Sequence, residues 1–449
     1  MNPETTMSAI PLTQGVDARD ALYRKITWRL LPFLTLCYML AYLDRINIGF
    51  AKLQMQNQLS FSDAAYGVAA GIFFIGYVLF EIPSNLLLPR IGARKTLSRI
   101  MVLWGITSAS MLFVRDIHTF YALRFLLGVF EAGFAPGMVL YLTYWYAPSR
   151  TARAMAVVMW AGPIGGVIGG PLSSWAMTML AGTHGLEGWQ WMFIVEGLPC
   201  CVLGVIAFFF LDDRPQQANW LSDEEKALLA ADLDAHRLNR AASEARHQSL
   251  RTVVSDPRVL TLAFSNFCVI AGIYTVSFWL PTILKTAGVA GTMAIGLWSS
   301  LPYVAAIAAM GWLCRSSDRR NERRRHSALA SIVGAVALAI AGLYPSQLGI
   351  ALPAIALSTA MLWASYTVLW ALPAGYLGTA AAAGGIAFIN ICGALGGFAS
   401  PIIIGVVKTL TGDMQAGMLT IVAIALAGAV AMLLNPIESR KSQAESPHG

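Results

Sequence analysis

Residues 414–434 read MQAGMLTIVAIALAGAVAMLL, and none of these side chains is ionisable. A helix rises 1.5 Å per residue, so a run of about 20 apolar residues spans the roughly 30 Å hydrocarbon core of a bilayer. This stretch therefore predicts a membrane-spanning helix. Comparable runs recur along the chain, and together they decide the fold.

Twelve such helices are predicted, with ends defined to within a few residues. Their ranges are 28–50, 65–88, 97–114, 118–142, 153–181, 190–211, 258–284, 292–313, 326–343, 349–372, 380–408 and 414–434. Continuous apolar runs do not fit a membrane β-barrel, whose strands are segments of about ten residues with alternating hydrophobicity. We therefore expect an all-α membrane protein.

The composition of the 449 residues agrees with this prediction. Only 12% are Asp, Glu, Lys or Arg, about half the roughly 25% of soluble domains. A soluble enzyme, a disordered chain and a nucleic-acid-binding protein are therefore not expected. The six cysteines have no C-x-x-C spacing and five lie in apolar runs, which favours core packing over disulfides or a metal site. No cofactor is expected, and residues 1–20 lack the pattern of a signal peptide.

Basic residues are distributed unevenly between the two sides of the predicted membrane domain. Of the 31 Lys and Arg residues, 23 lie in tails and loops on the side of the N-terminus, and four lie in the loops of the other side. Cytoplasmic loops carry an excess of Lys and Arg. Both termini are therefore expected in the cytoplasm, with a bacterial inner membrane favoured. The net charge of +7 is then an orientation signal and indicates no nucleic-acid partner.

The one long hydrophilic segment, 212–256, divides the predicted helices six and six. It is interpreted as a cytoplasmic linker with a helix that follows Ser222 and runs to about Arg240. The expected parts are a cytoplasmic tail, a six-helix bundle, the linker, a second six-helix bundle and a second cytoplasmic tail, with the bounds 1–27, 28–211, 212–256, 257–434 and 435–449.

Traces of an internal repeat relate the two halves. Gly166 and Pro171 in the fifth predicted helix match Gly396 and Pro401 in the eleventh, at an offset of 230 residues in both cases. The fifth helix is rich in Gly and Pro at 162–171, which favours close packing and a bend. We therefore predict two pseudo-symmetric bundles.

Four ionisable residues lie at mid-depth in the membrane-spanning helices of the first half, where a charge raises the free energy of insertion: Asp44, Arg45, Arg124 and Glu131. Each costs roughly 2.5–3.5 kcal/mol on insertion scales. Asp44 and Arg45 point about 100° apart on a helix, so that one faces a neighbouring helix and the other a central cavity. Buried ion pairs between helices are one explanation. We favour a carrier that binds a charged solute between its halves, because the second half has no ionisable residue at mid-depth.

The second half supplies only neutral polar candidates at this depth: Asn266, Tyr274, Ser277, Tyr366, Thr367 and Asn390. Each either contacts a ligand or joins two helices. In the first half, Tyr42 and Tyr77 are further candidates for binding a solute, and Glu81 is a candidate for a gating network.

Any proton that moves through this protein must be carried by a carboxyl group, because all six histidines fall in loops, tails or helix ends. Asp44 and Glu131 are the two candidates. Arg45 and Arg124 keep their charge at physiological pH and suit forked contacts with a carboxylate.

At these residues the sequence resembles the anion:cation symporter family of the major facilitator superfamily. The most specific stretch is YLDRINIGFA at 42–51. Further matching stretches are GY at 76–77, EIPSN at 81–85, LRF at 123–125, the segment 128–133 around Glu131, and Gly311 with SDR at 317–319. The resemblance covers nearly the whole chain. It implies two six-helix bundles that use the proton motive force to import small organic anions by alternating access.

The resemblance also implies residue roles. Proton coupling falls to Asp44 and Glu131, and Arg124 is able to pair with Glu131. The residues implied at the substrate are Arg45, Tyr77, Arg124 and Asn390, with Tyr42 beside them. The gating motif corresponds to Arg90, Gly92, Arg94 and Lys95 after the second predicted helix, and to Asp318 and Arg319 after the eighth.

Two departures from the family pattern bear on gating and specificity. Pro89 replaces the usual acidic residue of the gating motif, and Pro163 replaces a glutamine found in some sugar-acid carriers. The pattern is closest to the tartrate and aromatic-acid branch, so a tartrate-like dicarboxylate is favoured, followed by phthalate or hydroxyphenylacetate. The alternatives are an anion exchanger, a proton-coupled drug-efflux antiporter and, from another class, a membrane-embedded enzyme or receptor. A monomer is expected.

Overall fold

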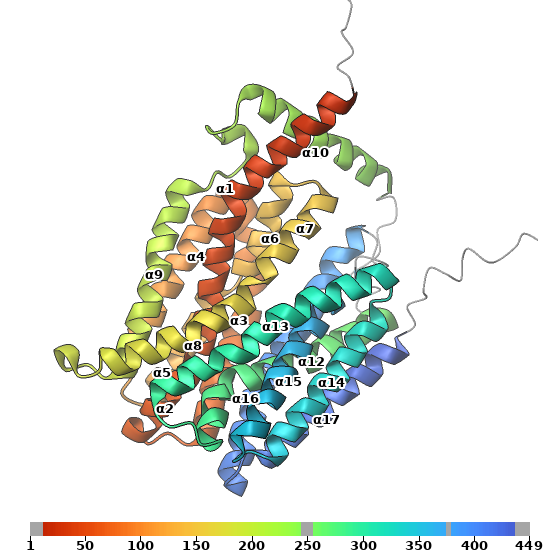
Figure 1. Cartoon of the computed structure of the whole chain (residues 1–449). Coiled ribbons are helices and arrows are strands. Elements are labelled where there is room, and N and C mark those ends of the chain that lie inside the picture. The colour runs from red at the N-terminus through yellow and green to blue at the C-terminus, as the bar shows by residue number, and fades with distance from the viewer. Residues whose placement is uncertain (1–11, 244–254, 374–378, 436–449) are drawn as a thin grey trace, which may run out of the picture.

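The computed structural model describes residues 12–243, 255–373 and 379–435 (Figure 1). Within these residues every regular element is a helix, and twelve stretches are long and apolar enough to cross a membrane. The predicted fold class, an all-α membrane protein with twelve spans, is confirmed.

The helices follow one another along the chain with short connections at most joints. They are α1 (Leu12–Ile46), α2 (Ile48–Leu59), α3 (Asp63–Ile91), α4 (Ala93–Ala109), α5 (Ile117–Glu131), α6 (Phe134–Trp145), α7 (Pro148–Met159), α8 (Ala161–Met179), α9 (Gly188–Phe210), α10 (Asp223–Ser243), α12 (Pro257–Thr286), α13 (Thr292–Arg320), α14 (Arg324–Leu343), α15 (Leu348–Leu369), α16 (Thr379–Thr411) and α17 (Gln415–Leu434).

Three predicted spans each consist of two helices. The first span breaks at Asn47, the fourth at Ala132 and Gly133, and the fifth at Trp160. Gly133 has a φ of +86°, a conformation that a β-carbon disfavours. The first two breaks lie within two residues of Arg45 and Glu131, so irregular backbone and mid-depth charge coincide.

The two six-helix bundles meet along two equivalent helix pairs. Helix α8 packs on α13, and α3 packs on α16. Small residues permit the contact: a β-carbon on Gly170 would lie 2.6 Å from the carbonyl oxygen of Gly296, and one on Gly67 would lie 2.4 Å from that of Pro401. The pseudo-symmetry that the repeat predicted is therefore present in the packing.

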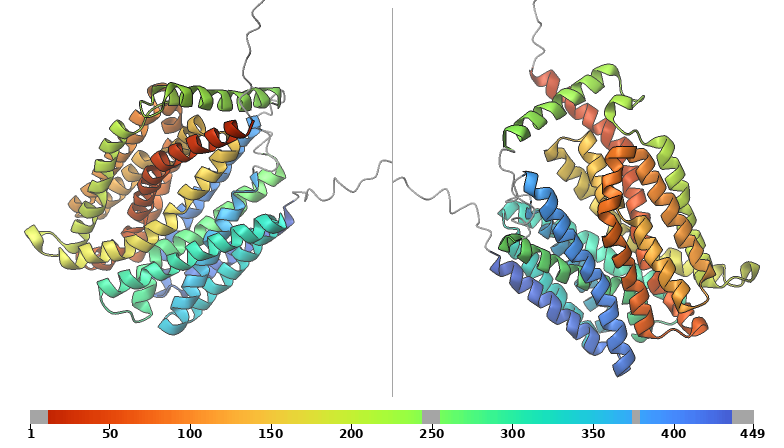
Figure 2. Two further views of the ribbon diagram at one scale, coloured as in Figure 1. Left: turned by 45° about the horizontal axis from the view of Figure 1, so that its top comes forward. Right: turned by 180° about the vertical axis from the view of Figure 1, so that it is seen from behind.

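We call the end of the bundle that holds the α3–α4 turn and α10 the linker end, and the opposite end the distal end. Helix α10 lies across the linker end beside the first turns of α1 (Figures 1 and 2). Tyr23 donates a hydrogen bond to Asp232 at 2.7 Å, and Lys25 pairs with Glu225 at 2.7 Å. The hydrogen bond from Lys25 lowers the pKa of Glu225. Helix α1 thus begins well before the predicted span, because its charged first turns bind the linker helix.

Several polar contacts join the two bundles near the distal end. Lys408 of α16 lies 3.2 Å from Asp63 of α3, and the Tyr66 hydroxyl donates to the Phe278 carbonyl at 2.8 Å. The backbone N–H of Ala64 donates to Thr409 at 2.9 Å. The arrangement is therefore closed at the distal end.

Candidate functional site

Arg45 and Glu131 form an ion pair between α1 and α5, in which Glu131 is buried and Arg45 is partly buried. The Nε atom of Arg45 donates to Oε1 of Glu131 at 2.7 Å, and Nη2 contacts the same oxygen. The Nη1 atom of Arg45 donates to the Tyr274 hydroxyl of α12 at 3.1 Å, so this guanidinium also joins the two bundles. The remaining oxygen of Glu131, Oε2, is buried and has no hydrogen-bond partner in residues 12–243, 255–373 and 379–435.

Arg124 is the other arginine of the site and is fully buried on α5. Its Nε atom donates to the Ala69 carbonyl at 3.2 Å, whereas Nη1 and Nη2 have no hydrogen-bond partner among the described residues. The expected alternative pairing of Arg124 with Glu131 is not the one observed, because Arg45 binds Glu131. A guanidinium stays charged and presents its donors in a fork that fits a carboxylate. Arg124 therefore has unused capacity for an anion.

Aromatic rings connect the two arginines. The guanidinium carbons of Arg45 and Arg124 lie 5.4 and 5.3 Å from the centroid of the Phe73 ring, and that of Arg45 lies 5.2 Å from the Tyr77 ring. Cations are attracted to such ring faces. Tyr77, a predicted substrate residue, thus lies beside Arg45.

Asp44 points away from Arg45, toward α4. Trp104 donates to Oδ2 at 2.7 Å, Asn47 donates to Oδ1 at 3.0 Å, and the Ser108 hydroxyl donates to Oδ1 as well. Three donors compensate a negative charge on this buried carboxyl group. The 100° separation expected from the sequence is thus visible in the partners of the two neighbours.

Three of the six neutral candidates in the second bundle meet polar groups of the first. Tyr274 accepts from Arg45, as described above, and Ser277 lies 2.9 Å from the Tyr42 hydroxyl. Asn390 donates to Glu81 at 2.7 Å across the interface of α3 and α16. The candidate substrate residue Asn390 and the candidate gating residue Glu81 therefore form one contact.

The other three neutral candidates contact their own bundle. Asn266 donates to the Ile389 carbonyl at 2.9 Å, and Thr367 donates to the Trp363 carbonyl at 2.8 Å. Tyr366 packs edge-on against the rings of Trp363 and Trp370. For these residues the helix-joining interpretation fits better than ligand contact.

A further buried acid, Glu196 on α9, is 1% exposed and was not among the candidates identified from the sequence. The amino-acid sequence does contain a signal for this residue, because Glu196 is the only Asp, Glu, Lys or Arg in the predicted helix 190–211. An acid within an apolar span is a candidate functional residue.

The gating motif of the first bundle is held by its own bundle. Gly92 has a φ of +93°, and a β-carbon there would lie 2.6 Å from Oδ1 of Asp213. The same oxygen accepts the backbone N–H of Arg94 at 2.8 Å, so Asp213 caps the start of α4. The Arg94 side chain lies 4.9 Å from the Phe208 ring.

The other motif residues are exposed at the linker end. Arg90 and Lys95 flank Gly92 on the surface. In the second bundle, Asp318 lies 3.6 Å from Arg323, and Arg319 is exposed. None of these contacts crosses between the bundles.

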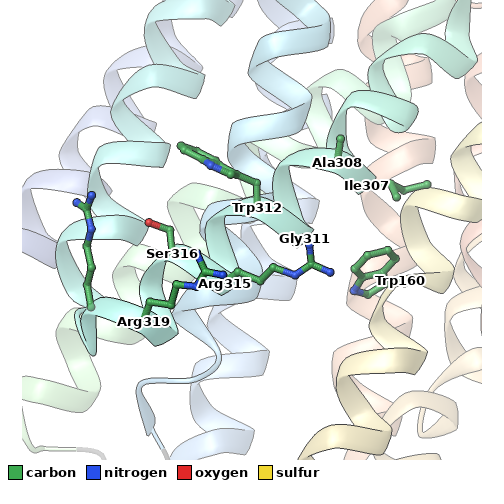
Figure 3. A pocket seen from close by; sticks show the side chains of 9 residues that line it. Trp160, Ile307, Ala308, Gly311, Trp312, Arg315, Ser316 and Arg319 are labelled. Atoms are coloured by element: carbon green, nitrogen blue, oxygen red, sulfur yellow. The ribbon is translucent and has the colours of Figure 1, made fainter.

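A cavity of about 610 Å³ lies between Trp160 and α13 (Figure 3). Arg315, Arg319 and Arg320 line it together with Trp312. It borders the charged end of α13 and does not reach the pair of Arg45 and Glu131. The space thus belongs to the linker end and not to the charged centre.

A second charged group closes the distal end. This distal charge cluster consists of Lys52, Asp63 and Lys408: Asp63 lies 2.6 Å from the Lys52 ammonium and 3.2 Å from that of Lys408. Lys52 is buried, and its ammonium lies 3.8 Å from the Trp279 ring of α12. Lys52 belongs to α2, and Lys408 belongs to α16.

We expect Asp63→Asn to open the distal end. The substitution leaves the buried Lys52 ammonium without its carboxylate, at a cost of about 3–5 kcal/mol to the closed arrangement. Spin labels at Ser60 and Asp413, in a background without native cysteines, measure the separation of the bundles. The variant should add a population with longer distances. Glu225→Gln, which removes an exposed ion pair at the linker end, is the matched control; an unchanged distance distribution in Asp63→Asn contradicts the role of the cluster.

No group of three or more His, Cys, Asp or Glu residues suited to a metal ion occurs within the described ranges. The site is thus composed of two arginines, carboxyl groups and aromatic side chains, which together suit an organic anion.

Comparisons with known proteins identify a family of transporters. The sequence profile of the Major Facilitator Superfamily matches residues 34–401. A protein of Pseudomonas putida, provisionally named as the metabolite transport protein NicT, is 45% identical and covers 89% of this chain and 90% of its own. A protein of Agrobacterium vitis, provisionally named as a tartrate transporter, is 42% identical and covers 96% of this chain and 94% of its own. A quinolone resistance transporter of Acinetobacter baumannii is 39% identical over 95% of this chain and 98% of its own.

Proposed function

Because the chain belongs to the Major Facilitator Superfamily, we propose that it imports a small organic carboxylate by proton symport, with a tartrate-like dicarboxylate as the favoured solute. Its relatives are transporters and not enzymes. The observation that carries the proposal is Arg124, a buried guanidinium whose Nη1 and Nη2 atoms have no hydrogen-bond partner in the described part of the chain. An anionic group of a solute would accept hydrogen bonds from these two nitrogen atoms.

The two arginines suit a solute with two carboxylates, because each arginine can bind one of them. One carboxylate binds the free fork of Arg124. The other binds Arg45, which lies against the same Phe73 ring. Tyr77 and Tyr274 adjoin Arg45, and a hydroxy-acid offers hydroxyl groups for such partners. A monocarboxylate leaves one arginine without an anion, and therefore binds more weakly.

Coupling follows from competition for Arg45. Glu131 occupies Nε and Nη2 of Arg45 as long as it is ionised. When Glu131 takes up a proton, its charge is lost and the attraction to Arg45 weakens, so a substrate carboxylate takes its place. Proton and substrate thus favour each other's binding. Asp44 is the second proton-coupling acid.

Alternating access follows from the two ends of the bundle. In the arrangement described, the distal charge cluster joins the bundles, and the cavity beside α13 lies at the linker end. With both termini in the cytoplasm, as the basic residues predict, this arrangement faces inward. Import then requires the cluster to separate as the linker end closes, in a protein that acts as a monomer.

The proposal predicts that purified protein in vesicles accumulates radiolabelled tartrate when the outside is more acidic than the inside. A pH difference of one unit supplies about 1.4 kcal/mol per proton, which is roughly a tenfold accumulation for one coupled proton. Phthalate and hydroxyphenylacetate serve as competing solutes. Tartrate uptake that is unaffected by an uncoupler contradicts proton symport.

An exporter that exchanges a drug for protons is the second candidate, favoured by the relative named as a quinolone resistance transporter. Anion exchange is a third. Counterflow in the absence of a proton gradient separates exchange from symport. An exporter is identified if the inward proton gradient expels the solute from the vesicles. The free fork of Arg124 argues against a purely cationic drug.

A further inference from the structure

Glu196 is a buried acid that forms no ion pair within the described part of the chain. It lies on α9 and is 1% exposed. The Ser173 hydroxyl of α8 donates to Oε1 at 2.7 Å, and Oε2 has no hydrogen-bond partner in the residues that the structure describes. An ionised carboxylate in such a place would keep one neutral donor, and its desolvation would cost several kcal/mol.

Glu196 has Asp44 as an acidic neighbour, and Asn47 connects the two. Asn47 is buried, donates to Asp44 at 3.0 Å and also lies beside the Glu196 carboxyl group. Trp104, Asn47 and Ser108 donate to Asp44, which is arranged for a negative charge, whereas Glu196 has the Ser173 hydroxyl and the neighbouring Asn47 amide beside it. Two neighbouring carboxyl groups in a dry interior resist simultaneous ionisation. The pair therefore suits one shared proton, held by Glu196 while Asp44 is ionised.

The neighbours of Glu196 that the structure describes are neutral or acidic. Helix α8 presents Ser173, α1 presents Asp44, and α4 presents Ser108 near the adjoining Gly197. The Cys200 thiol, one turn further along α9, donates to the backbone carbonyl of Glu196 and not to its side chain.

Glu196 lies closer to the distal start of its helix than Glu131 does, which gives the order in which a proton reaches the two acids. Glu196 is eight residues from the distal start of α9, or about 12 Å along the helix. Glu131 is fourteen residues from the distal start of α5, or about 21 Å. A proton that enters from the distal end therefore meets Glu196 before Glu131.

We propose that Glu196 is a third proton-carrying residue, which receives a proton from the distal side and shares it with Asp44 beside Asn47. The inference rests on the proposed proton symport. In the transfer, the O–H bond of Glu196 breaks, an O–H bond forms on Asp44, and the electron pair stays on Glu196 as a carboxylate. The charge of the pair remains −1. A second proton from the distal side then restores neutral Glu196.

Two variants separate proton carriage from helix packing. Glu196→Gln keeps an oxygen that accepts the Ser173 hydrogen bond but has no acidic proton to release or take up. Ser173→Ala keeps the acid and removes the hydrogen bond. For tartrate uptake in vesicles, we expect Glu196→Gln to lower uptake driven by a proton gradient at least about tenfold and to change its dependence on external pH, while counterflow stays within about twofold of wild type. Ser173→Ala should keep the wild-type pH dependence.

The opposite pattern overturns the proposal. If Glu196→Gln shows the pH dependence of the wild type while Ser173→Ala loses stability and activity, Glu196 only packs helices. If wild-type uptake itself ignores the proton gradient, the proposed symport fails, and that result is distinct from a failure of Glu196 alone.

A measurement without substrate covers the case in which Glu196→Gln does not assemble. Infrared spectra of the wild type and of Glu196→Asp at neutral pH report protonated carboxyl groups directly. A protonated carboxyl band that shifts in Glu196→Asp supports the proposal. A spectrum in which every such band is the same in both proteins overturns it.

Discussion

Replacing Arg124 with glutamine is expected to abolish tartrate binding and uptake. Glutamine keeps a polar side chain of moderate size but offers neither the charge nor the fork of Nη1 and Nη2, which have no partner among the described residues. Loss of one member of a buried charge pair costs about 2–5 kcal/mol, so affinity should fall by roughly 30- to 3,000-fold. Calorimetric titration of the purified protein with tartrate measures this directly.

Two further variants show whether the loss of tartrate binding is specific to the charge and shape of the Arg124 guanidinium. Arg124→Lys keeps the charge without the fork, so we expect binding between that of the wild type and that of Arg124→Gln. Arg150→Gln is the matched control, because Arg150 pairs with Asp20 at 2.6 Å at an exposed site of the linker end. Tartrate binding by a folded Arg124→Gln within about twofold of wild type contradicts the assignment of Arg124 to the substrate.

The features that follow from single-helix periodicity were predictable from the sequence. Apolar runs of membrane length gave the twelve spans, since length and charge decide insertion before any tertiary contact forms. The orientations of Asp44 and Arg45 follow from the same geometry, because 100° separates neighbours on any helix. The repeat likewise predicted two pseudo-symmetric bundles, and Pro401, one of its residues, packs against Gly67 of the other bundle.

Pairing between helices was not predictable in the same way. The chain sequence allows Glu131 to pair with Arg124 seven residues away, yet Arg45 binds it, because α5 ends at Glu131 and the break there brings the carboxylate to the end of α1. The distal charge cluster depends on residues from α2, α3 and α16, whose proximity is a property of the assembled bundles. Local patterns contain no information on such distances.

Glu196 shows a different limit of prediction from the amino-acid sequence. The charge was visible in the sequence, but its meaning depends on Asn47 and Ser173, which come from other helices and determine how few hydrogen bonds the acid receives. Whether a membrane acid is paired, solvated or neutral is set by tertiary neighbours. Sequence reasoning therefore finds the candidates, and packing assigns their chemistry.

Replacing Glu131 with glutamine is expected to uncouple transport from the proton gradient. Glutamine resembles protonated Glu131 in shape and charge, so Arg45 loses its anionic partner permanently and is free for substrate at any pH. Tartrate should still bind and exchange across the membrane. Accumulation driven by a one-unit pH gradient, roughly tenfold for one coupled proton in the wild type, should fall to about onefold. Parallel assays of driven uptake and counterflow in vesicles measure the two activities.

The pH dependence of binding gives the sharpest comparison. In the wild type, tartrate affinity should weaken as pH rises, because ionised Glu131 competes for Arg45. In Glu131→Gln the affinity should no longer depend on that ionisation and should stay high. Glu225→Gln removes an exposed acid paired with Lys25 and should behave like the wild type. If Glu131→Gln still accumulates tartrate against its gradient, Glu131 carries no coupled proton, and Asp44 becomes the acid to which coupling must be assigned.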